Sequence, residues 1–211
     1  MNKEDKLFTN KMIINFIIPM AIEKVLLRSI SIVDNIMVSH LGEDILSGVE
    51  LASRFNTFIY NIFIGLVLGG MILVSQLLGR KDINSARRVT YTLTTFLTLI
   101  SLLFSVVIFF GSENIVSLLY GQINEQTYNS AVTYLKVLAT ACPMQVVYFC
   151  GTYLSRAMKD SKTPTIISVA RNIINILCNY IFIYQFNMGV LGAALGTITA
   201  YYASAIIIFI L

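Results

Sequence analysis

Charged side chains are scarce in this sequence. Asp, Glu, Lys and Arg make up 12% of the 211 residues, whereas a soluble domain carries about a quarter. Hydrophobic residues make up 56%, and the mean hydropathy is +0.77. This composition excludes an ordinary soluble domain and predicts an all-α, polytopic membrane protein surrounded by the lipid bilayer. The net charge of +4 does not indicate a nucleic-acid partner, because the charges fall in short segments between apolar runs.

Other features are missing as well. The three cysteines, Cys142, Cys150 and Cys178, lie in apolar stretches without metal-ligand spacing or a paired framework, so we expect reduced thiols. No nucleophile–base set and no phosphate-binding loop is visible, so neither an enzyme nor a bound cofactor is predicted. The polar start MNKEDKLFTN precedes an apolar run too long for a signal peptide, and no cleavable signal is predicted.

Six apolar runs are long enough to cross a bilayer, which takes about 20 mainly apolar residues. They cover residues 12–38, 52–78, 89–110, 131–155, 164–186 and 189–211. The sequence therefore predicts a six-transmembrane-helix bundle, with residues 1–211 forming a single lobe. The last run stops at Leu211 without a polar tail, which indicates a truncated chain or one half of a larger protein. Pro143 interrupts the fourth run and predicts a kink.

Basic residues are confined to alternate segments between these runs. Lys and Arg occur in the N-terminal tail, in GRKDINSARR (79–88) and in SRAMKDSKTP (155–164). The intervening segments SHLGEDILSGVE (39–50), GSENIVSLLYGQINEQTYNS (111–130) and QFNMG (185–189) contain neither. Cytoplasmic loops carry the excess of Lys and Arg, so we predict that the N-terminus is cytoplasmic.

The first run contains an unusual number of charges. A carboxylate within a span is costly and usually faces a bundle interior, a cavity or an ion path, and this favours a functional Asp34 over a helix-end residue at the water interface. Glu23 and Asp34 share one helix face at about 16 Å, and Lys24 and Arg28 share another. These charges indicate either a stripe along a water-filled cavity or neutralisation of Glu23 by a neighbouring helix.

Three amides lie on one face of the fifth run. Asn172, Asn175 and Asn179 occur at positions i, i+3 and i+7, so this face must be buried or wet. Amide oxygens suit a hard cation, and hydrogen bonding between helices, which is common but modest in strength, is the alternative. Arg171 precedes Asn175 by one turn and is a candidate interior counter-charge. Tyr148 is either a substrate contact or an interface anchor.

Several stretches resemble multidrug and toxin extrusion (MATE) transporters. IVDNIMVSHLGEDILSGVELAS is similar to the end of the first helix and the first loop of that family, and GLVLGGMILVSQLLGRKDINSARR to its glycine-rich second helix and basic loop. SRAMKDSKTP resembles the loop after the fourth helix, and NIINILCNYIFIYQFNMGVLGAALGT the fifth helix and the start of the sixth. The resemblance runs in order over nearly the whole chain.

The resemblance implies one six-helix lobe of a twelve-helix transporter in the plasma (inner) membrane. Such proteins exchange Na⁺ or H⁺ for cationic or amphipathic drugs. Asp34 matches the acidic residue of the first helix, which implies a proton or Na⁺ site with Asn175 and Asn179 beside it. Asn179 stands where some members carry Asp, so a two-carboxylate proton site is not expected.

The resemblance also leaves the substrate and the partner of this lobe open. Glu23, Asn172 and Tyr148 are the candidate substrate-cavity residues. The first helix carries more charged residues than is usual in this family, namely Glu23, Lys24 and Arg28. A flippase for lipid-linked saccharides is therefore an alternative. A half-length membrane scaffold is another, and a second lobe or a homodimer partner is needed to form a two-lobe cleft.

Overall fold

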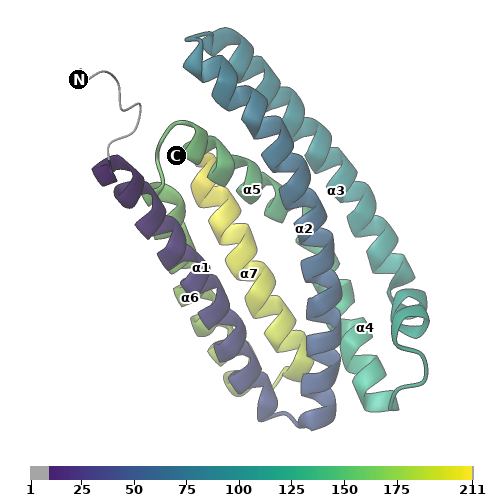
Figure 1. Ribbon diagram of the computed structural model, residues 1–211. Coiled ribbons are helices and arrows are strands. Elements are labelled where there is room, and N and C mark those ends of the chain that lie inside the picture. The colour runs from purple at the N-terminus through teal and green to yellow at the C-terminus, as the bar shows by residue number, and fades with distance from the viewer. Residues whose placement is uncertain (1–9, 211) are drawn as a thin grey trace.

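The protein is a bundle of helices (Figure 1). The computed structural model describes residues 10–210, except for a number of side chains on the first helix, and the side chain of Glu23 lies outside the described residues. The helices are α1 (Asn10–Ser39), α2 (Glu43–Gly79), α3 (Ile83–Tyr120), α4 (Glu125–Thr140), α5 (Cys142–Ala157), α6 (Lys162–Asn179), the π-helix η1 (Tyr180–Gln185) and α7 (Gly189–Ile210). The described part of the chain contains no strand. The predicted all-α fold is confirmed.

Over the described residues, each predicted apolar run falls on one helical unit, except that Phe186 at the end of the fifth run lies past η1. Four units are long and apolar enough to cross a membrane: α2, α3, α6 with η1, and α7. The pair α4 and α5 qualifies as a fifth unit, bent by 53°. The bend lies at Ala141, and Pro143 occupies the first turn of α5, as the sequence predicts. Helix α1 does not meet the same test on its described residues, so its crossing stays a prediction.

The predicted lengths of the loops are wrong. Helix α3 continues through Tyr120, so the first half of the predicted loop 111–130 is helical, and only residues 121–124 lie outside helices. Helix α2 likewise begins at Glu43, within the predicted loop 39–50. Hydropathy marks the part of a helix that contacts lipid, whereas capping marks where its hydrogen bonds end. At the start of α3, for example, Asp82 accepts a hydrogen bond from the Ser85 backbone N–H at 3.0 Å.

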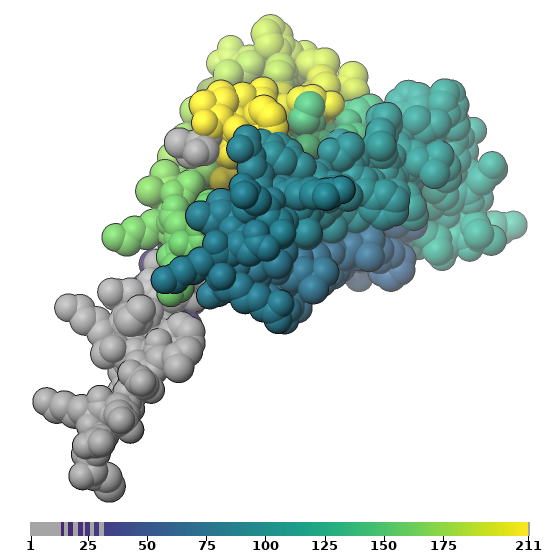
Figure 2. Space-filling view, turned by 90° about the horizontal axis from the view of Figure 1, so that it is seen from above, coloured from purple at the N-terminus to yellow at the C-terminus, as the bar shows by residue number. Residues whose placement is uncertain are grey.

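Helix α7 packs against α4, α5 and α6. Helix α1 packs on α6, α6 on α7, and α2 on α3 and α4. Figure 1 shows α1 and α2 joined by a short turn, with α7 between them and the α2–α3 turn projecting past the end of α7. Figure 2 shows this projecting turn from above, in blue and teal.

The outer face of the bundle is apolar. Large side chains of α3 point outward, including Leu103 at 63% and Phe110 at 79% exposure. A helix of a soluble bundle would bury such residues or replace them with polar ones. A lipid surround removes them from water without any protein partner.

Candidate functional site

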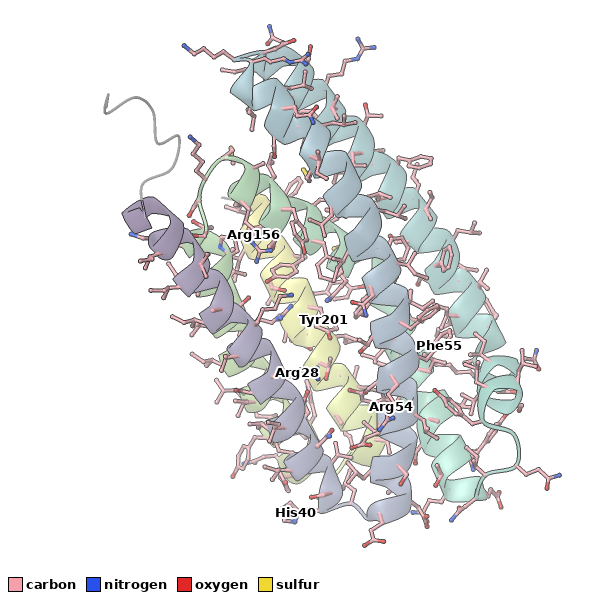
Figure 3. The ribbon with its side chains drawn as sticks, viewed as in Figure 1. Arg28, His40, Arg54, Phe55, Arg156 and Tyr201 are labelled. Atoms are coloured by element: carbon pink, nitrogen blue, oxygen red, sulfur yellow. The ribbon has the colours of Figure 1, made fainter. Side chains whose placement is uncertain are left out.

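A cavity of about 470 Å³ opens between α1 and α2 and reaches α4, α6 and α7. Its size falls in the range of small-molecule sites. Figure 3 shows Arg28 on α1, Arg54 on α2 and Tyr201 on α7 around this region. The charged and aromatic lining residues are Asp34, Glu50, Arg28, Arg54, Arg171, Tyr60, Tyr134 and Tyr201. The cavity therefore combines charges of both signs with an aromatic wall.

Asp34 lies at the α1 side of this cavity. Its side chain is half-buried, and its Oδ1 accepts a hydrogen bond from Nδ2 of Asn179 at 2.6 Å. Asn179 is fully buried, so α6 holds the carboxylate from behind the cavity wall. The Oδ1 atom of Asn179 has no hydrogen-bond partner among the described residues and lies against Gly196 of α7.

A second polar group lies beside Asp34 on the cavity wall. Nδ2 of Asn175 donates to Oγ1 of Thr197 at 3.4 Å, and the hydroxyls of Thr197 and Tyr134 are 3.5 Å apart. All three residues are buried and line the cavity, and Oδ1 of Asn175 lacks a partner within the described part of the chain. Sequence reasoning missed Thr197 and Tyr134, because one hydroxyl in an apolar run carries no spacing signal.

Arg171 is buried in the same wall, one turn of α6 before Asn175. It is 3% exposed, and its guanidinium lies 5.0 Å from the ring centre of Tyr148 and 5.7 Å from that of Tyr201. Cation–π contacts contribute about 0.5–2 kcal/mol each, whereas burying a charge costs several kcal/mol. The tyrosines therefore offset only part of the cost of burying Arg171.

Arg171 has no acidic partner in the described part of the chain. The two ion pairs there join Glu50 to Arg54 at 3.7 Å and Glu113 to Lys136 at 2.7 Å. The predicted counter-charge role of Arg171 is thus not realised as an ion pair among these residues. The Glu50–Arg54 pair is solvent-exposed at the cavity mouth, where such pairs contribute about 0–1 kcal/mol.

The remaining predicted site residues fall behind the cavity or outside the described residues. Tyr148 is buried beneath Arg171, with its hydroxyl 3.0 Å from that of Ser168. Asn172 is buried on the same face of α6. Neither residue lines the cavity, and Glu23 is the one whose side chain is not described. Their roles in substrate binding stay predictions.

The site does not have the composition of a multivalent metal centre. Among the described residues, no group of three His, Cys, Asp or Glu side chains comes together. The combination on this wall is a single carboxylate with amide and hydroxyl oxygens. Such a set suits a proton or a monovalent cation that loses and regains its water easily.

Comparison with known proteins decides the family. The MatE family model matches residues 19–181, which include Asp34 and the amide face of α6. The chain belongs to the MatE family. The resemblance seen in the sequence is confirmed, and the six helical units correspond to one lobe of a MATE transporter.

Curated relatives and solved structures agree with this assignment. The chain is 28% identical to the probable multidrug resistance protein YpnP of Bacillus subtilis, over 89% of this chain and 42% of that protein. It is 27% identical to the multidrug export protein MepA of Staphylococcus saprophyticus, over 89% of this chain and 41% of that protein.

A MOP-superfamily transporter from Pyrococcus furiosus, described by the reverse polarity of its binding pocket, has a TM-score of 0.84 at 24% identity. This match covers 94% of the present chain and 43% of that one, and it establishes the fold alone. This MatE chain thus spans less than half the length of the relatives that it matches.

Proposed function

We propose that this chain is the ion-coupling lobe of an antiporter that exports amphipathic small molecules in exchange for Na⁺ or H⁺. The observation that supports it is Asp34, a half-buried carboxylate that faces a cavity of drug-like volume inside an apolar bundle. One relative is named a multidrug export protein, and another a probable multidrug resistance protein. An intramembrane carboxylate facing a cavity is the usual site of ion coupling.

The ion binds at Asp34 and the residues around it. Asn179 holds Oδ1 of the carboxylate and leaves the second oxygen for the ion. Asn175 and Thr197 present an amide oxygen and a hydroxyl on the same wall. A bound Na⁺ takes oxygen ligands from this set, whereas a proton needs Asp34 alone.

Of the two substrate classes that the family resemblance implies, the amphipathic class fits this cavity better. Tyr60, Tyr134 and Tyr201 offer aromatic surface to an apolar body. Arg28, Arg54 and Arg171 line the same space and repel an organic cation. A substrate with a large apolar part satisfies the tyrosines without a positive charge.

Coupling follows from competition within one cavity. Binding of the ion neutralises Asp34 and changes which packing of α1 against α6 is favoured, and this expels the substrate. Alternating access then needs a second lobe that rocks against this one, supplied by another six-helix lobe or by a second copy. We place the lobe in the plasma (inner) membrane with its N-terminus in the cytoplasm, as the basic segments indicate.

Two measurements with purified protein test this function. The first is binding of radioactive Na⁺ in detergent and its competition by H⁺. We expect Asp34→Asn to abolish binding of both ions, whereas Asp44→Asn, at an exposed position on α2, leaves it unchanged. Ion binding that survives Asp34→Asn would remove Asp34 from the mechanism.

The second measurement is efflux of a fluorescent amphipathic probe from proteoliposomes under a Na⁺ or H⁺ gradient. Efflux that follows the gradient and is lost in Asp34→Asn supports the antiporter. Ion binding without efflux, both in the chain alone and in a linked pair of copies, would instead indicate a half-length membrane scaffold.

A further inference from the structure

Arg171 is the strongest unexplained feature of the cavity. Arg171 is 3% exposed and lines the cavity, and its Nε has no hydrogen-bond partner among the described residues. A buried charge is normally paired or bound to a ligand. In the described part of the chain its two cation–π contacts are with the rings of Tyr148 and Tyr201.

We propose that Arg171 binds an anionic group of the transported molecule, a carboxylate, sulfonate or phosphate carried by an amphipathic body. This inference rests on the proposed function and specifies its substrate class. The planar fork of a guanidinium matches these oxyanions with two parallel hydrogen bonds. The rings of Tyr148 and Tyr201, 5.0 and 5.7 Å from the guanidinium carbon, hold the group in place, and its Nε is left for the ligand.

The anion site and the ion site occupy different places along α6. Arg171 and Asn179 are eight residues apart, which corresponds to about 12 Å along a helix. Asp34 is bonded to Asn179 and has no ion pair with Arg171. The same cavity therefore holds an anionic group near Arg171 and a cation near Asp34.

The other arginines favour the same ligand charge at the mouth of the cavity. Arg28 and Arg54 are both exposed and line the opening. Glu50, the second carboxylate of the lining, pairs with Arg54 and accepts a hydrogen bond from Asn35 at 3.0 Å. Because Glu50 is engaged in this way, the positive charge of Arg28 and Arg171 is left to act on a ligand.

The arrangement also matches the predicted orientation of the chain. The basic segment before α6 is predicted to be cytoplasmic, so Arg171 lies nearer the cytoplasm than Asn179. The proposed anion site then lies on the cytoplasmic side of the proposed ion site. The tyrosines that line the cavity contact the apolar body between these two points.

The test is binding of radiolabelled taurocholate, an amphipathic sulfonate, to purified protein in detergent, with tetraphenylphosphonium as the cationic counterpart. We expect taurocholate to bind more tightly than tetraphenylphosphonium. Arg171→Gln should weaken taurocholate binding at least about tenfold, as expected for loss of a charge-assisted contact. The control Arg88→Gln, at an exposed position of α3, should change nothing.

Binding of Na⁺ or H⁺ separates this inference from the proposed function. If Arg171→Gln keeps ion binding and loses taurocholate binding, the proposed function and the anion site are both supported. If it keeps ion binding and binds taurocholate as tightly as the wild type, Arg171 is structural and the inference is overturned. If Asp34→Asn keeps ion binding, the coupling site fails, while the taurocholate result still decides the anion site.

Two further experiments address a variant that does not fold and the source of the bound anion. If Arg171→Gln does not fold, Arg28→Gln at the exposed mouth should weaken taurocholate binding two- to fivefold, and an unchanged affinity in that variant overturns the inference.

In nanodiscs, competition by added phosphatidylglycerol identifies a lipid headgroup as the anion, and the absence of competition identifies a free compound. Equal affinity of the wild-type protein for taurocholate and tetraphenylphosphonium would overturn the inference for a lipid headgroup and for a free compound alike.

Discussion

The side-chain amide of Asn179 donates a 2.6 Å hydrogen bond to the carboxylate of Asp34, from a position 145 residues later in the sequence. The bond joins α1 to α6 and orients the carboxylate that faces the cavity. Asn179 therefore acts as a positioning residue for Asp34. Its own Oδ1 lies against Gly196 of α7.

Loss of this bond should weaken ion binding without removing it. We expect Asn179→Leu to reduce Na⁺ affinity about tenfold, because a hydrogen bond to a charged group is worth about 1.5–3 kcal/mol. Radioactive Na⁺ binding measures the change. Asn61→Leu, at an exposed position of α2, is the control and should retain wild-type affinity. Unchanged affinity in Asn179→Leu would show that Asp34 is oriented by other groups.

Gly196 should tolerate no side chain. A Cβ at this position would overlap Oδ1 of Asn179 and lie 2.9 Å from its backbone nitrogen, so α6 and α7 would have to separate. We expect Gly196→Ala to cost about 1–3 kcal/mol, measured by unfolding in mixed detergent. Gly65→Ala is the matched control, because a Cβ there meets nothing within 4 Å. A neutral Gly196→Ala would mean that the two helices separate at little cost.

The polar residues of the cavity could be predicted in part, because some of them stand out in the sequence. Asp34 stands out as a carboxylate in an apolar run, and the amides of α6 repeat with the helical period. Thr197 has no such spacing and was missed. Arg171 was predicted as a counter-charge, yet its contacts are tyrosine rings contributed by α5 and α7, and the approach of those helices is not encoded by any local period.

Helix ends were the least predictable part of the fold. The segment from Gly111 to Tyr120 is polar enough to be taken for a loop, but it continues α3. Backbone hydrogen bonding does not stop where lipid contact stops, so hydropathy shortens the predicted helices. The bend before Pro143 was predictable because proline removes a backbone donor whatever surrounds it.

Asp160 should stabilise the start of α6 in a pH-dependent way. Its Oδ1 accepts backbone hydrogen bonds from Lys162 at 2.9 Å and Thr163 at 3.1 Å, and hydrogen bonds from Thr163 hold the pKa of the carboxyl below its usual value. A lowered pKa gives stability that is present above the unfolded-state pKa of about 3.9 and lost as the pH falls through the folded-state value.

The role of Asp160 at the start of α6 can be tested with the variants Asp160→Ala and Asp160→Asn. We expect Asp160→Ala to cost about 0.5–2 kcal/mol near neutral pH, whereas Asp160→Asn keeps the acceptor and costs little. Unfolding at pH 7 and pH 3 measures both effects, and the difference between wild type and Asp160→Asn should shrink at the lower pH. A wild-type stability for Asp160→Ala would show that these hydrogen bonds of Asp160 contribute nothing.

Orientation can be tested at the short loops that the structure defines. Cysteines at exposed Gln122 and Lys81, in a background with Cys178 replaced by Ser, should differ in access. We expect a membrane-impermeant maleimide to label Gln122→Cys in intact cells, and Lys81→Cys only after permeabilisation. The opposite pattern would invert the predicted N-in topology.

Asn175 distinguishes an ion ligand from hydrogen bonding between helices. Its amide donates to Thr197, so Asn175→Leu and Thr197→Val both break this bond, and each should cost about 0.6–2 kcal/mol of stability. Thr197→Val retains the unpartnered Oδ1 of Asn175, whereas Asn175→Leu removes it. If that oxygen contacts the ion, Asn175→Leu should reduce Na⁺ affinity well beyond Thr197→Val. Equal affinities in the two variants, with equal losses of stability, would leave Asn175 as a residue that only joins α6 to α7.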